Sequence, residues 1–453
     1  MSLRLYSWLR VFLRLVAGVF FRQVEVVGLE NVPESGPVIF AGNHPNSLID
    51  PLLIVVSCGR VVRFAAKDVL FRSPLLRPVL RALGAVPIAR RSDHADASEA
   101  VAHNEIAFDT LIEVLARGGT IGIFPEGLSH DAPQLVRLKT GAARIAAGVC
   151  QRHPELAVAI VPCGLTYMQR RRFRSRVLLQ FGAPIVVDAA GPGDSQVVAA
   201  VTAEIDRGLR ALTVNAADWQ TLRVLDGFRR LYQPPQISIH DRVELARRFN
   251  AEYPRVRDEP EVSALYTRVS AYLDRLDAAG VSDRDLRRTL SRGDALARIA
   301  RHLVLIVVWL PLALPGAILH APVGLLVQLA APMLTPRKDV LAATKLLAGL
   351  LLVLASYAAG IAWLGFRVSA RAALLAVIAL PITGYATLRV FDRAASVRRG
   401  FSTLVRLFAF DREIQALREE RAALETAVVA AVNRFRPADM VLLFPRGPES
   451  ASQ

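Results

Sequence analysis

A histidine and an aspartate lie close together in a segment that should form a turn. His44 follows the apolar run of residues 37–41, and Asp50 comes six positions after it. A carboxylate at this separation can hold one imidazole nitrogen while the other nitrogen removes a proton from a bound hydroxyl. Taken alone, such a pair is more often a structural hydrogen bond. It becomes a candidate general base only in the company of further polar residues of the right kind.

Basic side chains follow a second predicted strand. Residues 85–89 end in Arg90 and Arg91, and guanidinium groups at a strand end suit bidentate binding of a phosphate. In a chain this rich in arginine, an ordinary surface charge is equally plausible.

A third apolar run, residues 120–124, leads into a Pro-Glu-Gly turn. Glu126 and Gly127 would suit a site for hydroxyl groups, and a solvated turn carboxylate is the plain alternative. Lys139 opens a helical pattern just downstream. Lysine is scarce in this chain, which favours a specific role for this one. The other lysines are Lys67, Lys338 and Lys345.

A fourth apolar run, residues 157–162, ends at Pro162, and core packing is its simplest explanation. The 3 cysteines match no zinc or disulfide pattern, and the 8 histidines show no ligand spacing. We therefore expect buried thiols and no metal ion.

Short β-branched runs alternate with helical patterns over residues 31–190. This alternation predicts an α/β domain with a mixed, largely parallel sheet flanked by helices. The expected strands cover residues 37–41, 61–65, 85–89, 120–124, 157–162 and 177–181.

Composition divides the rest of the chain. Residues 1–30 predict an interfacial membrane helix, because arginines interrupt an apolar helical pattern and no cleavage site follows. Residues 191–300 are polar and mostly helical, and residues 301–390 are strongly apolar. Residues 391–453 form a tail with an amphipathic helix.

The apolar region contains two uncharged stretches that could cross a membrane, at about residues 346–366 and 372–388. Residues 303–336 contain several prolines, which predicts short, re-entrant pieces instead. Positive side chains are more numerous outside the two spans than between them. The positive-inside rule therefore places both ends of this hairpin in the cytoplasm.

The net charge of +16, with 53% hydrophobic residues among 453, favours an anionic partner. Because long apolar runs accompany the charge and no nucleic-acid-reading motif is present, we expect a membrane surface and no nucleic acid. The arginine- and alanine-rich composition suggests a GC-rich bacterial genome. We therefore expect the inner membrane of a bacterium, with the domain of residues 31–190 on its cytoplasmic face.

Together the four motifs, in this order, resemble the glycerophospholipid acyltransferase family, which includes glycerol-3-phosphate and lysophosphatidate acyltransferases. The resemblance covers roughly residues 30–190 and is carried by Asn-His-Pro-Asn…Asp-Pro and Phe-Pro-Glu-Gly-x-Ser. It implies that His44 and Asp50 form the catalytic dyad. It also implies that Arg90, Glu126 and Gly127 bind the acceptor and that Pro162 lies on the acyl-donor side. From its position and the scarcity of lysine, we expect Lys139 to join Arg90 at the acceptor's phosphate.

The separation of His44 and Asp50 is one residue longer than is usual in the family. Similar sequences with this spacing and with later apolar segments look like a glycerol-3-phosphate or dihydroxyacetone-phosphate acyltransferase branch. The resemblance thus implies transfer of a fatty acyl chain to one of these acceptors in phospholipid synthesis. Lysophosphatidate acylation, lysophospholipid remodelling and a non-catalytic lipid-binding protein on the same fold are the alternatives.

The expected mechanism is direct attack of the acceptor hydroxyl on an acyl thioester. No serine or cysteine lies in a nucleophile-elbow context, which disfavours an acyl-enzyme. We expect no cofactor beyond acyl-CoA or acyl carrier protein as the co-substrate.

Overall fold

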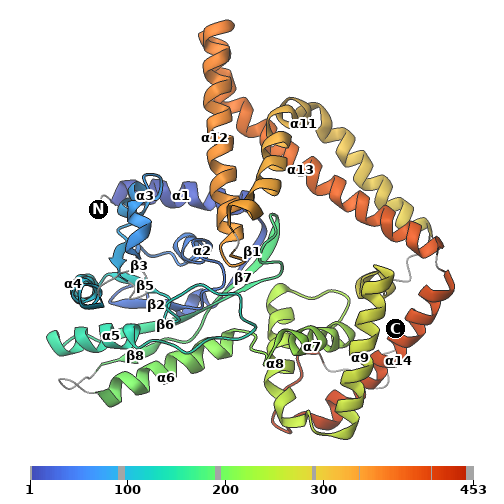
Figure 1. Ribbon diagram of the computed structural model, residues 1–453, viewed down its shortest axis with the longest axis horizontal. Coiled ribbons are helices and arrows are strands. Elements are labelled where there is room, and N and C mark those ends of the chain that lie inside the picture. The colour runs from blue at the N-terminus through green and yellow to red at the C-terminus, as the bar shows by residue number, and fades with distance from the viewer. Residues whose placement is uncertain are drawn as a thin grey trace. The chain divides into compact units, whose positions relative to one another are not determined.

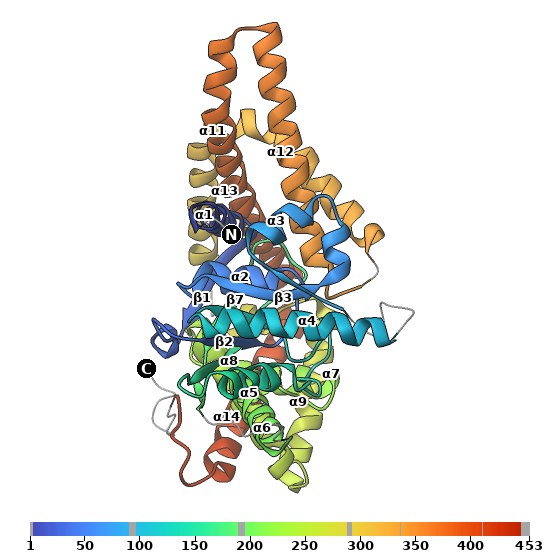
Figure 2. The ribbon, with the colours of Figure 1, turned by 90° about the vertical axis from the view of Figure 1, so that its left-hand side faces the viewer.

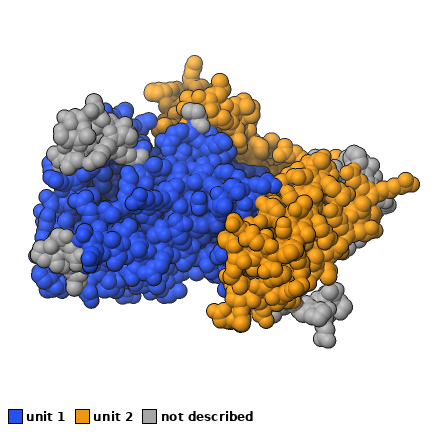
Figure 3. Space-filling model, turned by 60° about the horizontal axis from the view of Figure 1, so that its bottom comes forward, with its two compact units in different colours: residues 1–222, 237–251, 337–343 blue, residues 223–236, 252–336, 344–453 orange. Residues whose placement is uncertain are grey.

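The computed structural model describes residues 3–89, 97–188, 195–287, 292–335, 337–409 and 411–444. The chain forms two compact units, each assembled from segments distant in sequence (Figure 3). Unit 1 comprises Met1–Leu222, Ile237–Ala251 and Arg337–Ala343. Unit 2 comprises Arg223–Gln236, Glu252–Pro336 and Thr344–Gln453.

Unit 1 is built around one sheet with strand order β1-β7-β6-β2-β5-β3-β4 and with β8 paired to β6. The β6–β7 and β6–β8 pairs are antiparallel and the other pairs are parallel. The predicted mixed, largely parallel α/β sheet is confirmed, and each expected strand is present. The strands are β1 (Phe21–Val27), β2 (Val38–Gly42), β3 (Val62–Lys67), β4 (Val86–Ile88), β5 (Thr120–Ile123), β6 (Val158–Tyr167), β7 (Ser175–Phe181) and β8 (Ile185–Val187).

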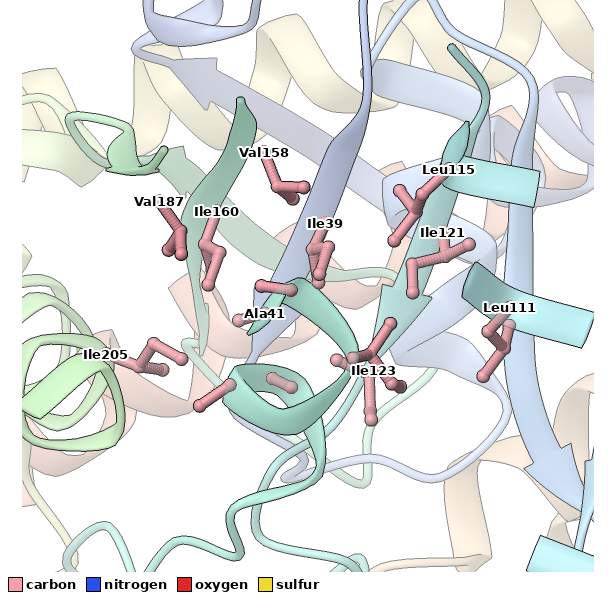
Figure 4. Close-up of a cluster of buried hydrophobic side chains, with 14 of the residues drawn as sticks. Ile39, Ala41, Leu111, Leu115, Ile121, Ile123, Val158, Ile160, Val187 and Ile205 are labelled. Carbon is pink, nitrogen blue, oxygen red and sulfur yellow. The ribbon is translucent and has the colours of Figure 1, made fainter. Parts of the chain in front are cut away.

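Helices cover both faces of this sheet (Figures 1 and 2). The helices α1 and α2 lie over one face, and α4, α5 and α6 lie over the other. Side chains alternate along a strand, so Ile39 and Ala41 of β2 join the cluster beneath α4, α5 and α6 (Figure 4). The helices of unit 1 are α1 (Leu3–Phe20), α2 (Ile49–Ser57), α3 (Leu76–Ala82), α4 (Ala97–Ala116), α5 (Gly141–Arg152) and α6 (Ser195–Leu212), with short 3-10 helices at Leu29–Asn31 and Asp68–Arg72.

Two predicted domain limits differ from the structure. The α/β unit does not end near residue 190, because Ile205 and Leu209 of α6 are buried in the same core as the strands. The exit from the N-terminal helix is β1, which pairs with β7 and so belongs to the same sheet. The sequence could not show this pairing, since the two strands are far apart along the chain.

The helix α1 is amphipathic, as predicted. Tyr6 and Ala17 are buried against the rest of unit 1, and the Tyr6 hydroxyl accepts a 2.9 Å hydrogen bond from Val62 N. The opposite side exposes apolar side chains, among them Trp8 at 75% and Leu15 at 66%. An exposed apolar stripe of this kind suits contact with a lipid surface.

Most of the remaining helices belong to unit 2, and all but one of them are long. Leu417, Leu424 and Val428 of α14 are fully buried, which confirms the amphipathic tail helix. The helices are α7 (Trp219–Tyr232), α8 (Ile239–Val256), α9 (Pro260–Ala279), α10 (Asp283–Arg287), α11 (Arg292–Leu334), α12 (Leu341–Arg367), α13 (Ala370–Ala409) and α14 (Asp411–Phe435).

The apolar region departs from the prediction in its first part. The prolines of α11 do not divide it into short pieces: one helix runs from Arg292 to Leu334 and bends in its middle (Figures 1 and 2). Apolar helices tolerate proline where neighbouring helices and side chains satisfy the freed backbone groups. The helix packs against α13, where the Thr387 hydroxyl lies 2.9 Å from the Ala313 carbonyl.

Three helices of the described part of the chain are long and apolar enough to cross a membrane: Ile299–Leu334, Leu341–Arg367 and Ala370–Arg398. These helices support association with a membrane.

Candidate active site

The predicted dyad forms at the turn between β2 and α2. His44 Nδ1 lies 2.9 Å from Asp50 Oδ2, so the two side chains are hydrogen-bonded. The extra residue between them is absorbed by a tight turn in which Ser47 adopts a left-handed φ of 45°. The Ile49 and Asp50 amides donate to the Asn46 and Ser47 carbonyls, which starts α2 directly at the dyad.

Asp50 is completely buried and accepts hydrogen bonds at both carboxylate oxygens. Oδ2 accepts from the Asn46 amide at 2.7 Å as well as from His44. Oδ1 accepts from the Tyr167 hydroxyl at 2.5 Å. Three hydrogen-bond donors thus hold the buried Asp50 carboxylate in place, and one of its oxygens faces the His44 imidazole.

The His44 ring is also fixed by stacking. It lies on the Phe124 ring with a centroid distance of 4.0 Å and an interplanar angle of 9°. Gly42 makes room for this ring, since a Cβ at Gly42 would lie 2.9 Å from a Phe124 ring carbon.

The second ring nitrogen of His44 is available. Nδ1 donates to Asp50, which leaves the lone pair on Nε2, and this atom has no hydrogen-bond partner within the described residues. The side chain is 14% exposed. His44 therefore has the tautomer, orientation and access that a general base requires.

The loop after β5 is organised around Glu126, which is only 2% exposed. One carboxylate oxygen accepts the His44 amide at 2.8 Å, and the other accepts the Val136 amide at 3.2 Å and the His130 ring. The Ala132 amide donates to His130 Nδ1, so it is His130 Nε2 that donates to Glu126. With its carboxylate fully engaged by the protein, Glu126 holds the loop beside the dyad, and any effect on the acceptor would pass through that loop.

Gly127 and Lys139 lie together. Gly127 has a φ of 75°, and a Cβ there would lie 2.8 Å from Lys139 Nζ. The Lys139 amide donates to the Pro125 carbonyl at 2.7 Å, which holds the two ends of the loop together. Lys139 is exposed and has no carboxylate partner among the residues described. It supplies a free positive charge to the loop that carries Glu126.

The same loop is fastened to the segment that precedes α12. The Ser129 hydroxyl donates to Asp339 at 2.6 Å, and Arg337 donates to Asp339 and to the Ser129 carbonyl. Burial opposes ionisation of Asp339, but the hydrogen bond from Ser129 and the charge of Arg337 lower its pKa. Asp339 is thus an anionic anchor for this loop.

The other predicted residues have different fates. Arg90 lies outside the described residues. Pro162 is buried in β6, where its ring packs near Gly208 of α6. The three cysteines are buried, and burial raises the pKa of Cys58 to about 11 and that of Cys163 well above its usual range. Such thiols are poor nucleophiles. No group of three metal-ligating side chains occurs among the residues described.

Sequence reasoning missed Tyr167 because it ended the strand at Pro162. In the structure β6 continues to Tyr167, since β8 pairs with it only up to Ile160 and β7 pairs with it only from Cys163. Pro162 lies in the gap between these two antiparallel partners, where its missing N–H costs no ladder bond to either. The available signal was the parallel pairing of β6 with β2, because the carboxyl ends of parallel strands lie at the same edge of the sheet.

Sequence reasoning also missed His130, which stands next to the recognised motif. A histidine four residues after Glu126 is the available signal, but whether the two side chains meet depends on the path of the loop.

We expect Glu126→Gln to lower kcat by about 10- to 100-fold. In the variant, the amide nitrogen of the glutamine must face one of the donors that now bond to a carboxylate oxygen, and the loss of that hydrogen bond, about 1–3 kcal/mol, should displace the loop beside His44. The KM of the acceptor should change by less than about twofold. Steady-state kinetics would measure both constants, with Glu155→Gln, an exposed glutamate, as the control. A raised acceptor KM with unchanged kcat would show instead that Glu126 contacts the acceptor.

Two family models match the chain. Residues 23–166 match the acyltransferase family, and residues 224–440 match the glycerol-3-phosphate acyltransferase 2 C-terminal domain. The first match contains the dyad and the loop after β5. The second covers most of α7 to α14.

Similar proteins carry related names. Glycerol-3-phosphate O-acyltransferase 2 of Saccharomyces cerevisiae is 36% identical over 49% of this chain and 31% of its own length. Glycerol-3-phosphate O-acyltransferase 1 of the same yeast is 26% identical over 68% of this chain and 53% of its own length. A 1-acyl-sn-glycerol-3-phosphate acyltransferase of Borreliella burgdorferi is 32% identical over 27% of this chain and 46% of its length. The chain thus spans well under two thirds of each of these relatives.

Among solved structures, a 1-acyl-sn-glycerophosphate acyltransferase of Thermotoga maritima is similar with a TM-score of 0.35 and 23% identity. The match covers 45% of this chain and 77% of that one.

Proposed function

We propose that this chain, which is homologous to the glycerol-3-phosphate acyltransferases, transfers a fatty acyl chain from an acyl thioester to a hydroxyl of glycerol-3-phosphate or dihydroxyacetone phosphate. The homology supports glycerolipid acyl transfer in phospholipid synthesis. The observation that carries the proposal is the hydrogen-bonded His44–Asp50 pair, which lies within the matched acyltransferase region. This pair leaves His44 Nε2 without a hydrogen-bond partner among the described residues.

The proposed reaction is a direct transfer. His44 Nε2 takes the proton of the acceptor hydroxyl as its oxygen bonds to the thioester carbonyl carbon, and Asp50 stabilises the imidazolium that forms. The carbon–sulfur bond then breaks, and the leaving thiolate takes up the proton from His44. The raised thiol pKa values support a route without an acyl-cysteine intermediate. No cofactor is needed beyond acyl-CoA or acyl carrier protein as the donor.

The acceptor is proposed to be held through its phosphate by Lys139, together with Arg90. Lys139 lies on Gly127, in the loop that also carries Glu126, and its charge is not neutralised by a neighbouring carboxylate of the described chain. Pro162 is proposed to lie on the acyl-donor side of the site.

We expect Lys139→Met to raise the KM of glycerol-3-phosphate about 10- to 150-fold while kcat stays within about twofold, since a hydrogen bond to a charged group contributes about 1.5–3 kcal/mol. Lys338→Met, which removes another exposed lysine, should leave both constants unchanged. An unaltered KM in the Lys139 variant would remove this residue from the proposed phosphate site.

Two features support a place at a membrane surface. The three apolar helices could cross a bilayer, and α1 exposes an apolar stripe. We propose the inner membrane of a bacterium, with the catalytic unit on the cytoplasmic side. The positively charged residues outside the two uncharged stretches, at about residues 346–366 and 372–388, support this orientation. They are Arg337, Lys338, Arg389, Arg393, Arg398 and Arg399.

A second candidate function is acylation of lysophosphatidate, which the similarity to the Borreliella enzyme favours. The test is acyl transfer by the purified full chain in detergent, with labelled acyl-CoA or acyl carrier protein as the donor. Glycerol-3-phosphate, dihydroxyacetone phosphate and lysophosphatidate would be offered in parallel. Product with either of the first two supports the proposal. Product with lysophosphatidate alone selects the second function, and binding without transfer to any acceptor selects a non-catalytic lipid-binding protein.

A further inference from the structure

We infer that Tyr167 is a positioning residue of the active site, which holds the Asp50 carboxylate and thereby sets the base strength of His44. This inference rests on the proposed acyl transfer. It concerns a residue beyond the end of the fourth motif, at the last position of β6.

The first support is the geometry at Asp50. Its Oδ2 accepts from His44 and from the Asn46 amide, and these two bonds alone would leave Oδ1 buried without a donor. The Tyr167 hydroxyl fills that position at 2.5 Å. With a donor on each oxygen the carboxylate plane cannot rotate, so Oδ2 stays directed at His44 Nδ1.

The second support is the way in which β6 is tied to the dyad turn. Asn43, which precedes the catalytic histidine, donates from Nδ2 to the Leu165 carbonyl at 3.1 Å and accepts from the Leu165 amide at 2.7 Å. These two bonds fix the position of Leu165 in β6 relative to the turn that carries His44. They therefore also fix Tyr167, two residues further along the strand.

The third support is the state of the phenol. Burial, with a smaller contribution from the nearby Asp50 charge, raises the pKa of Tyr167 well above its usual range. The hydroxyl consequently remains protonated, and it can only donate to the carboxylate. The ring itself is held in place, with its centroid 6.0 Å from that of Phe21.

A donor on Oδ1 draws negative charge away from Oδ2 and so weakens the stabilisation of a protonated His44. Loss of this hydroxyl should make His44 a stronger base. The other charged or titratable groups around the dyad remain in place when only the Tyr167 oxygen is removed. These groups are Glu126 and His130 of the loop after β5 and Arg170 beyond β6.

The experiment compares Tyr167→Phe with the wild-type full chain in detergent. We expect kcat to fall about tenfold, as for loss of a hydrogen bond to a charged group. The acidic limb of the pH profile of kcat/KM should shift to higher pH by about half a unit. A ring-fluorinated tyrosine at position 167, a stronger hydrogen-bond donor of nearly the same shape, should shift that limb to lower pH.

Tyr6→Phe is the matched control, because Tyr6 is also a buried tyrosine whose hydroxyl bonds to the protein, at Val62, away from the dyad. It should lower the melting temperature without moving the pH profile. A Tyr167→Phe profile that coincides with that of the wild type, while His44→Ala is inactive, would overturn the inference and leave the proposed function intact. A wild-type chain that transfers no acyl group to any acceptor would overturn both. Should Tyr167→Phe fail to fold, the fluorinated variant decides the matter by the direction of its shift.

Discussion

Replacement of His44 by alanine is expected to lower the rate of acyl transfer by about three to four orders of magnitude, which is the upper range for loss of a general base. No other imidazole among the described residues bonds to Asp50, and His130 is committed to Glu126. The KM values of both substrates should change little, because His44 acts on the proton that moves in the transition state. Single-turnover and steady-state assays with labelled donor would measure the loss.

The control for this variant is His153→Ala, which removes an exposed histidine and should retain wild-type kinetics. The melting temperatures of the two variants should be compared, since His44 also stacks on Phe124. An active, folded His44→Ala variant would contradict general-base catalysis by this residue, and the mechanism would have to be abandoned.

Replacement of Asp50 by asparagine should lower kcat by about two to three orders of magnitude, because an amide offers one acceptor oxygen where the carboxylate offers two. The amide nitrogen must then face either the Tyr167 hydroxyl or the donors on the His44 side. If the nitrogen faces His44, it favours the tautomer that carries its proton on Nε2, which cannot accept one from the acceptor. Stability should fall by about 1–3 kcal/mol, as for a buried donor left without an acceptor.

Activity and denaturant unfolding would be measured together for Asp50→Asn. Asp109→Asn, at an exposed aspartate paired with Arg152, should change neither quantity beyond about 0.5 kcal/mol. A fully active Asp50→Asn enzyme would show that His44 needs no carboxylate to orient it.

The fold of the catalytic unit was largely predictable, because most of its strands are short runs of apolar β-branched residues between turns. Two strands were not. β1 follows a helix without a turn signal, and β8 contains only Ile185–Val187. β1 is stabilised by pairing with β7, and β8 by pairing with β6. A local sequence pattern cannot predict pairing with a strand elsewhere in the chain.

The long helix α11 also departs from its local sequence pattern, which predicted breaks that the structure does not have. Four prolines within Arg292–Leu334 are a strong local signal for separate pieces. The helix nevertheless continues through them and packs against α13, where the Thr387 hydroxyl lies 2.9 Å from the Ala313 carbonyl. In an apolar region the cost of an unsatisfied backbone group is high, so one helix, which satisfies most of its own backbone groups, is favoured over separate pieces.

The sequence by itself determined which residues could do chemistry, because His44, Asp50, Glu126 and Lys139 follow strands whose pattern is local. The tertiary structure alone decided what each of them contacts. It closed the dyad through a left-handed Ser47, buried Glu126 among protein donors, and brought Tyr167 onto Asp50 from a strand more than 100 residues away. The physical reason is that hydrogen bonds and burial depend on which distant elements meet, whereas residue type and spacing record only what each element could contribute.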